Sequence, residues 1–219
     1  GEWRLAGEID LESESFTVRF TTDHLVLGPH IRQVLAGSIH PHWDRYGPKG
    51  VAGAAVEVSR VPKGEVTVKA TLMLKDVSLT YKLFPYTVDH IRGEIDFSTN
   101  GFWVKDLFAR SGDSSVRVSG GANGYEAETD YEILLDIKNV PLDEKLRKAL
   151  DANAQRLWDE FHPSGRVNVT GKVIRERGPD KPVLNPLHLE FQEVSFIFRE
   201  FPYPVKNGSG EVFVLSPNV

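Results

Sequence analysis

The sequence predicts a β-rich α+β fold in which one long antiparallel sheet is built from tandem units of about 115 residues, each with one helical segment. Three observations lead to this prediction. Short landmark segments recur along the chain. Apolar and polar residues alternate over much of its length, and an apolar stripe at helical spacing interrupts this alternation twice.

Two pairs of landmarks show the internal repeat. Phe84-Pro85-Tyr86 recurs 117 positions later as Phe201-Pro202-Tyr203, and Trp43-Asp44 recurs 115 positions later as Trp158-Asp159. Identical residues continue on both sides of each landmark, well above the frequency that ordinary composition would give. We therefore expect the two copies to share a structure, which by itself says nothing about function.

The positions of the copies predict where the units begin and end. Residues 1–26 are expected to be the tail end of a preceding repeat unit, residues 27–139 a complete unit, and residues 140–219 the truncated front part of the next. Repeat arrays normally end in atypical capping units, and none is evident in this sequence. We therefore expect flanking repeats in a longer parent chain.

A helical segment opens each unit. Residues 142–161 place apolar side chains mostly three, four or seven positions apart, which is typical of an amphipathic helix, and Pro163 favours its end. The first copy repeats the pattern over residues 27–46, where Gly37 and Pro41 are expected to divide the helix into two short pieces.

Strands are expected where apolar and polar residues alternate with a period of two. The alternating segments are residues 16–20, 66–74, 77–81, 93–97, 102–109, 114–119, 131–137 and 167–169. They predict about six strands per unit and a meandering antiparallel sheet with one apolar and one polar face.

Composition excludes several classes of function. The net charge of −5 provides no basic field for binding nucleic acid. The absence of cysteine excludes disulfides and thiolate metal sites. No apolar run approaches the roughly 18 residues that a membrane-spanning helix needs.

Two short motifs have a chemical interpretation and a simpler structural one. His40 and His42 are spaced to chelate a metal, but a solvated turn is the favoured interpretation. Residues 120–124 are glycine-rich but lack the Lys-Ser/Thr ending of a phosphate loop, so we expect a strand connection. The sequence contains no catalytic motif that we recognise, and we predict neither an enzyme nor a bound metal or cofactor.

The repeat itself carries a family resemblance. The run from Val140-Pro141-Leu142-Asp143 through Leu157-Trp158 to Arg166-Val167, with Phe201-Pro202-Tyr203 and Gly210-Glu211-Val212, resembles the AsmA-like family of Gram-negative envelope proteins (the AsmA, TamB and YhdP type). The resemblance spans essentially the whole chain. It implies a long curved, taco-shaped β-sheet with a hydrophobic groove, located in the periplasm within a parent protein anchored in the inner membrane.

This resemblance implies a non-enzymatic segment of a bacterial envelope protein whose β-groove serves phospholipid transport between the inner and outer membranes. A continuous apolar face would shield acyl chains from water, which stabilises them by about 0.8 kcal/mol per methylene. The expected partners are phospholipid or another acyl-chain lipid and the flanking repeats of the parent chain. The candidate groove residues are Val77, Leu79, Tyr81, Phe84, Tyr86, Val194, Phe196, Phe198, Phe201 and Tyr203.

Other interpretations remain open. The Phe-Pro-Tyr segments are interpreted first as core wedges at strand breaks, with acyl-chain contact as the second interpretation. A structural scaffold of β-repeats would have its apolar face wholly closed by helices. An enzyme or carbohydrate-binding module would need a polar cleft with carboxylates or aromatic residues clustered outside the core.

Overall fold

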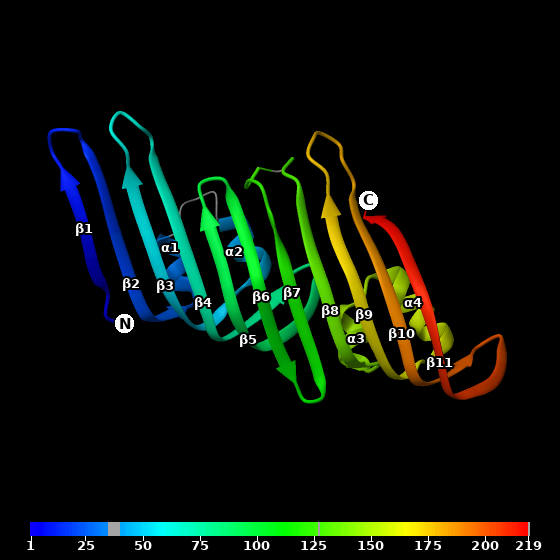
Figure 1. Cartoon of the computed structure of the whole chain (residues 1–219). Helices are drawn as coiled ribbons and strands as arrows, with labels where there is room; N and C mark the ends of the chain where they lie inside the picture. Colours follow the sequence, from blue (N-terminus) through cyan, green and yellow to red (C-terminus); the bar gives the residue numbers. More distant parts are fainter. Residues whose placement is uncertain (35–39, 127, 219) are drawn as a thin grey trace.

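The described part of the chain, residues 1–34, 40–126 and 128–218 of a computed structural model, forms one open antiparallel sheet (Figure 1). Each strand pairs with the next one in the sequence. The strands are β1 (Arg4–Asp10), β2 (Ser15–Leu27), β3 (Lys49–Arg60), β4 (Val66–Tyr81), β5 (Phe84–Ser98), β6 (Gly101–Ser111), β7 (Ser114–Ala122), β8 (Tyr131–Pro141), β9 (Ser164–Arg175), β10 (Val183–Phe198) and β11 (Phe201–Asn218). The predicted β-rich antiparallel fold is confirmed.

Two pairs of short helices interrupt the run of strands. α1 (Pro29–Val34) and α2 (His40–Tyr46) connect β2 to β3, and α3 (Glu144–Ala149) and α4 (Ala152–Phe161) connect β8 to β9. Both pairs lie on the same face of the sheet, which we call the inner face (Figure 1). They also lie at the same end of the strands, the helix end. The opposite end, which carries the β1–β2 and β3–β4 connections, is the open end.

The second helical segment is divided, although the sequence predicts one helix over residues 142–161. Leu150 is extended, with φ −71° and ψ 155°. The Asp151 carboxylate then accepts hydrogen bonds from the backbone N–H groups of Asn153 and Ala154 at 2.8 and 2.9 Å. Such an aspartate cap stabilises a new helix start, so the apolar stripe continues across a break in the backbone.

The first helical segment also contains two helices. Pro41, expected to break it, lies in the first turn of α2, where proline is tolerated because the N–H group that it lacks has no partner within the helix. The break predicted at Gly37 lies outside the described residues.

Three strand predictions are wrong in detail. Residues 66–74 and 77–81 belong to the single strand β4, whose pairing with β5 contains bulges. β3 is missing from the predicted strands because the glycines and alanines of residues 50–55 hide its alternation. Gly120 and Gly121, predicted within a connection, lie inside β7.

Strand register places the apolar side chains on the inner face. One row of paired residues crosses ten strands near the open end: Leu5, Phe20, Val56, Ala70, Phe97, Phe102, Ala122, Tyr131, Arg175 and Val183. A second row crosses β6 to β11: Ala109, Val116, Ile137, Val169, Leu189 and Val212. The inner face is therefore largely apolar from β1 to β11.

Bulges and glycines bend the sheet. The lower ends of β4 and β5 curve behind the sheet in Figure 1, where their register shifts three times, as expected for β-bulges. Gly120 has φ +126°, a conformation that L side chains rarely adopt, and a Cβ there would lie 2.1 Å from the carbonyl oxygen of Glu132. Glycine at this position lets β7 and β8 approach where the sheet curves.

The two helix pairs are built alike. Arg32 donates to the Asp44 carboxylate at 2.6 and 2.7 Å, joining α1 to α2. Arg147 donates to Asp159 at 2.7 and 2.8 Å, joining α3 to α4. Each arginine stands 115 positions from its counterpart, and so does each aspartate.

The strands next to the helix pairs correspond as well. The Tyr46 and Tyr81 rings stack with centroids 5.3 Å apart, and the Phe161 and Phe198 rings stack at 4.9 Å. The β4–β5 ladder shifts register between Leu74/Val77, Val77/Leu79 and Thr80/Tyr81, and the β10–β11 ladder shifts 117 positions later, between Phe191/Val194, Val194/Phe196 and Ile197/Phe198.

We predict that Gly120→Ala lowers the free energy of unfolding by about 1–3 kcal/mol, because the new Cβ meets backbone in a strained conformation. Urea denaturation measures the change. Gly210→Ala is the matched control, since a Cβ at Gly210 has nothing within 4 Å. Equal effects of the two substitutions would contradict the assignment of Gly120 to the bend.

Candidate functional site

The described helices pack on the inner face around the helix end. A buried core cluster lies there, and Trp43 of α2 packs against it. The buried members of this cluster are Leu27, Ala52, Leu74, Val77, Ile91 and Ala109. α3 contacts β5 and α4 contacts β10, close to the ends of these strands. In the described chain, the row at the open end is most exposed on β1 and β2, at Leu5 and Phe20, whereas Ala122 of the same row is buried.

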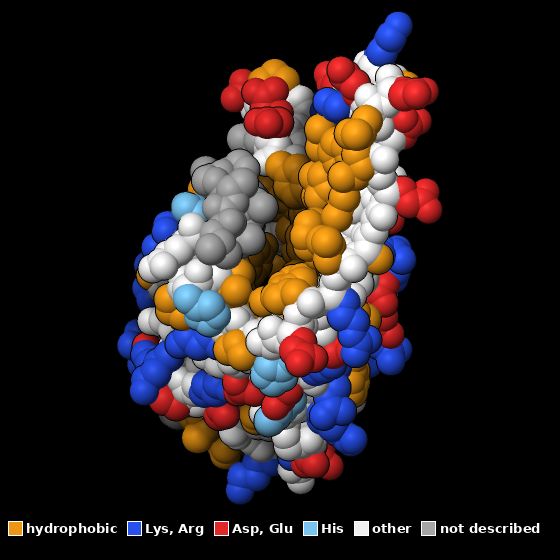
Figure 2. Space-filling view, turned by 90° about the vertical axis from the view of Figure 1, so that its left-hand side faces the viewer, with side chains coloured by type: hydrophobic (Ala, Val, Ile, Leu, Met, Phe, Trp, Pro, Cys, Tyr) orange, Lys and Arg blue, Asp and Glu red, His pale blue; other side chains and the backbone are white. Residues whose placement is uncertain are grey.

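Large apolar side chains are exposed on the inner face near the open end. Leu5 and Ile9 are each 68% exposed, Val68 is 43% exposed and Phe20 is 36% exposed. Figure 2, seen from the β1 side, shows a hollow lined by hydrophobic side chains along the inner face of the sheet. We call this hollow the groove. Exposed apolar patches of this kind mark sites of contact with other proteins, with membranes or with apolar ligands.

The groove candidates from β4 and β5 lie at the helix end. Val77 is only 2% exposed, within the core cluster, and Leu79 packs against that cluster. Tyr81 stacks on Tyr46, and burial raises the pKa of the Tyr46 phenol, with the nearby Tyr81 as the second cause. These side chains join the helices to the sheet rather than lining the open groove.

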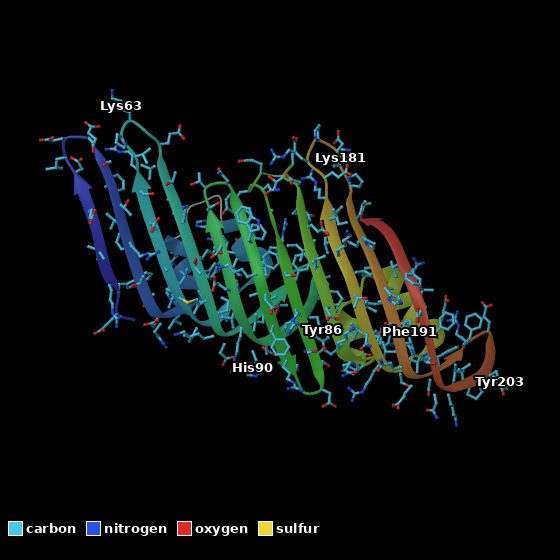
Figure 3. All side chains as sticks on the ribbon, in the orientation of Figure 1. Lys63, Tyr86, His90, Lys181, Phe191 and Tyr203 are labelled. Carbon is cyan, nitrogen blue, oxygen red and sulfur yellow. The ribbon has the colours of Figure 1, made fainter. Side chains whose placement is uncertain are left out.

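The first Phe-Pro-Tyr segment begins β5. The rings of Phe84 and Tyr86 stack at 6.1 Å, and the Lys145 ammonium of α3 lies 4.1 Å from the Tyr86 ring centroid. Burial raises the pKa of Tyr86. Tyr86 lies at the helix end of the sheet in Figure 3. The β3–β4 and β9–β10 connections, labelled there by Lys63 and Lys181, lie at the opposite end.

The candidates from β10 and β11 are arranged similarly. Val194 is buried, and Phe196 and Phe198 pack on Phe161 of α4 at centroid distances of 5.9 and 4.9 Å. Tyr203 is 68% exposed at the edge of the sheet (Figure 3). The predicted contact at Phe201 lies outside the described side chains.

Sequence reasoning missed the side chains that line the open groove. Leu5 and Ile9 of β1 pair with Phe20 and Phe16 of β2 on the inner face. The sequence predicts β2 from its alternation, but alternation alone does not indicate which stretch of the apolar face the helices cover. That cover depends on where the helices pack.

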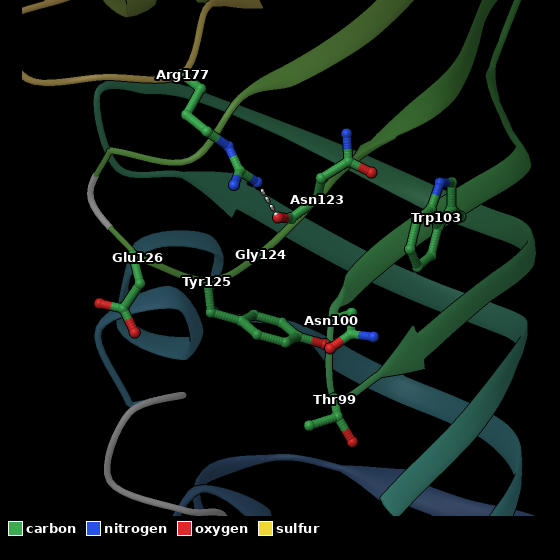
Figure 4. A pocket seen from close by; sticks show the side chains of 8 residues that line it. All are labelled: Thr99, Asn100, Trp103, Asn123, Gly124, Tyr125, Glu126 and Arg177. Carbon is green, nitrogen blue, oxygen red and sulfur yellow. Dashed lines mark hydrogen bonds between the residues drawn. The ribbon is translucent and has the colours of Figure 1, made fainter.

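A polar pocket of about 470 Å³ lies at the open end, among the β5–β6, β7–β8 and β9–β10 connections (Figure 4). The Tyr125 hydroxyl lies 2.8 Å from the carbonyl oxygens of both Ser98 and Gly101. Arg177 donates to the Asn123 carbonyl at 2.9 Å and to the Asp130 carboxylate at 3.0 Å. These bonds brace the three connections against one another.

Arginine partners set the electrostatics of the helix pairs. The hydrogen bonds from Arg32 and Arg147 hold the pKa values of Asp44 and Asp159 below the ordinary value of 3.8. Among the described residues, no group of three or more His, Asp and Glu side chains could hold a metal ion. Of the predicted His-x-His pair, the His42 side chain lies outside the described residues.

Comparison of the sequence with models of known families and with curated proteins found no match, and comparison of the structure with solved structures found none either. None of the helices in the described ranges has the length and hydropathy needed to cross a membrane.

The pKa directions predict how acid affects the helix pairs. Because folding lowers the pKa of Asp159, the ion pair with Arg147 stabilises the protein above about pH 3.8, the ordinary value, and this contribution is lost as pH falls through the lower folded value. We predict that the melting temperature of Asp159→Asn lies below that of the wild type at pH 7 and that the gap narrows below about pH 3.8. Calorimetry from pH 7 to pH 2 measures the two melting temperatures. A difference between them that stays constant with pH would contradict the assigned role of the Arg147–Asp159 ion pair.

Proposed function

We propose that this chain is a non-enzymatic segment of a bacterial envelope protein whose groove holds the acyl chains of phospholipids and lets them pass between the inner and outer membranes. The observation that carries the proposal is the continuity of the apolar row from Leu5 to Tyr131, together with the exposure of large side chains beside it. Acyl chains need a surface of this kind, because each methylene removed from water contributes about 0.8 kcal/mol.

The character of the groove also suits movement of a lipid along it. Neighbouring strands present similar Val, Phe and Ala side chains, so a lipid displaced from one strand to the next exchanges one apolar contact for another. Non-directional contacts of this kind impose no bond that must break at each step.

We further propose that the sheet consists of tandem units of about 115 residues, with the boundaries predicted from the sequence. The Arg–Asp pairs, the stacked rings and the register shifts that recur after 115 or 117 positions support this proposal. The resemblance to AsmA-like proteins supports a periplasmic location within a parent protein anchored in the inner membrane, where flanking repeats would lengthen the groove.

The scaffold alternative requires helices that close the apolar face. Leu5, Ile9 and Val68 are exposed on that face, which favours the groove. The carbohydrate-binding alternative requires aromatics around a polar cleft, and Trp103 and Tyr125 line such a pocket. The polar groups of Tyr125 and Arg177 are engaged in bracing the connections, so the groove is the better supported site.

We predict that Val68→Glu weakens binding of a fluorescently labelled phospholipid by at least about tenfold, because a carboxylate would be buried against acyl chains. Fluorescence titration of the purified protein measures the dissociation constant. Val68 is chosen because it is 43% exposed on the inner face, so the charge is tolerated in the lipid-free protein.

Leu134→Glu is the matched control. Leu134 is 46% exposed in β8 and pairs with Lys172 on the outer face, opposite the groove. The control should bind lipid as the wild type does. Equal affinity of the wild type and both variants for the lipid, or an equal loss of affinity in both variants, would contradict the groove as the lipid site.

A further inference from the structure

Two arginines stand on the inner face at the open end. Arg60 ends β3, where it pairs with Phe16 of β2, and Arg175 ends β9, where it pairs with Tyr131 of β8. Along the inner-face rows at the open end, these are the charged side chains in the part of the chain that the structure describes. Each therefore places a positive charge where the apolar groove meets water.

The Arg60 guanidinium is held in place and still has a free donor group. Its Nε donates to the Glu14 carbonyl oxygen at 2.8 Å. The guanidinium carbon, Cζ, lies 5.6 Å from the centroid of the Phe16 ring. Nη2 is 3.9 Å from the Glu14 carboxylate, a loose pair in which Glu14 is 80% exposed. None of the described residues accepts a hydrogen bond from Nη1.

We propose that Arg60 binds the phosphate group of a lipid whose acyl chains lie in the groove, an inference that rests on the proposed function. A guanidinium presents parallel N–H donors that match the oxygens of a phosphate, and stacking on Phe16 orients that fork. A phospholipid carries its phosphate at the head end of its acyl chains, and Arg60 lies at the corresponding edge of the apolar groove.

The same position recurs 115 residues later. Arg175 pairs with Tyr131 as Arg60 pairs with Phe16, and the next strand places Val183 opposite Arg175 as it places Val66 opposite Arg60. Arg175 donates to the carbonyl oxygens of Lys181, Gly178 and Thr129 at 3.2, 3.3 and 3.5 Å, so each of its three nitrogens has a partner, unlike Nη1 of Arg60. The position of the positive charge at the edge of the groove therefore recurs, while the donor group on which the proposal rests is that of Arg60.

The test compares two lipids with identical acyl chains, dioleoyl phosphatidylethanolamine and dioleoylglycerol, which lacks the phosphate. Competition with a fluorescent fatty acid measures both dissociation constants. The wild type should bind the phospholipid at least about tenfold more tightly than dioleoylglycerol. Arg60→Gln should lose most of that preference while keeping its affinity for dioleoylglycerol. Glu14→Gln should bind the phospholipid more tightly, because its carboxylate no longer competes for Arg60.

Arg19→Gln is the matched control, because Arg19 pairs with Glu57 on the outer face one strand away. It should behave as the wild type. Equal affinity of the wild type for both lipids would overturn the phosphate site and leave the groove standing. Failure to bind either lipid would overturn the proposed function itself. Inorganic phosphate that competes as strongly as the phospholipid would show a free-anion site and would also overturn the inference.

Discussion

The pairing register of the antiparallel strands is the constraint on which the rest of this structure depends. Because side chains alternate along a strand, a slip of one residue would turn the apolar face of that strand toward the opposite side of the sheet. The row from Leu5 to Val183 shows that register is kept across ten strands. Bulges and glycines such as Gly120 then bend the sheet without moving its apolar side chains to the outer face.

The apolar face of such a sheet is either buried under other elements or left exposed, where it can contact an apolar partner. The helix pairs cover the helix end, where Trp43 seals the core around Val77 and the Arg–Asp pairs join the helices. The open end keeps its apolar residues exposed, and Arg60 places a charge at its edge. The sheet therefore has a buried core at one end and the groove, with a charged edge, at the other. A ligand with apolar chains and a polar head matches this arrangement.

The architecture follows from sequence more readily than the site does. Period-two alternation suffices for the antiparallel sheet, because it depends on neighbouring residues alone. The division between α3 and α4 is harder to predict, since the apolar residues on both sides of Asp151 keep a helical spacing of seven, from Leu150 to Leu157. The candidate groove residues of β4 and β10 belong to apolar, alternating segments, but Tyr81 and Phe198 stack against the helices, where bulges interrupt the strand register. The open groove is lined by residues as ordinary as Leu5 and Val68, and only the placement of the helices distinguishes them.

Native mass spectrometry of the chain, expressed in bacteria and purified under non-denaturing conditions, tests most directly the central claim that the groove binds phospholipid. The account predicts a folded protein that carries one or more phospholipid masses, which disappear on extraction with organic solvent and return after incubation with phospholipid vesicles. A folded chain that shows only its own 24.5 kDa mass, before and after such incubation, would contradict the account.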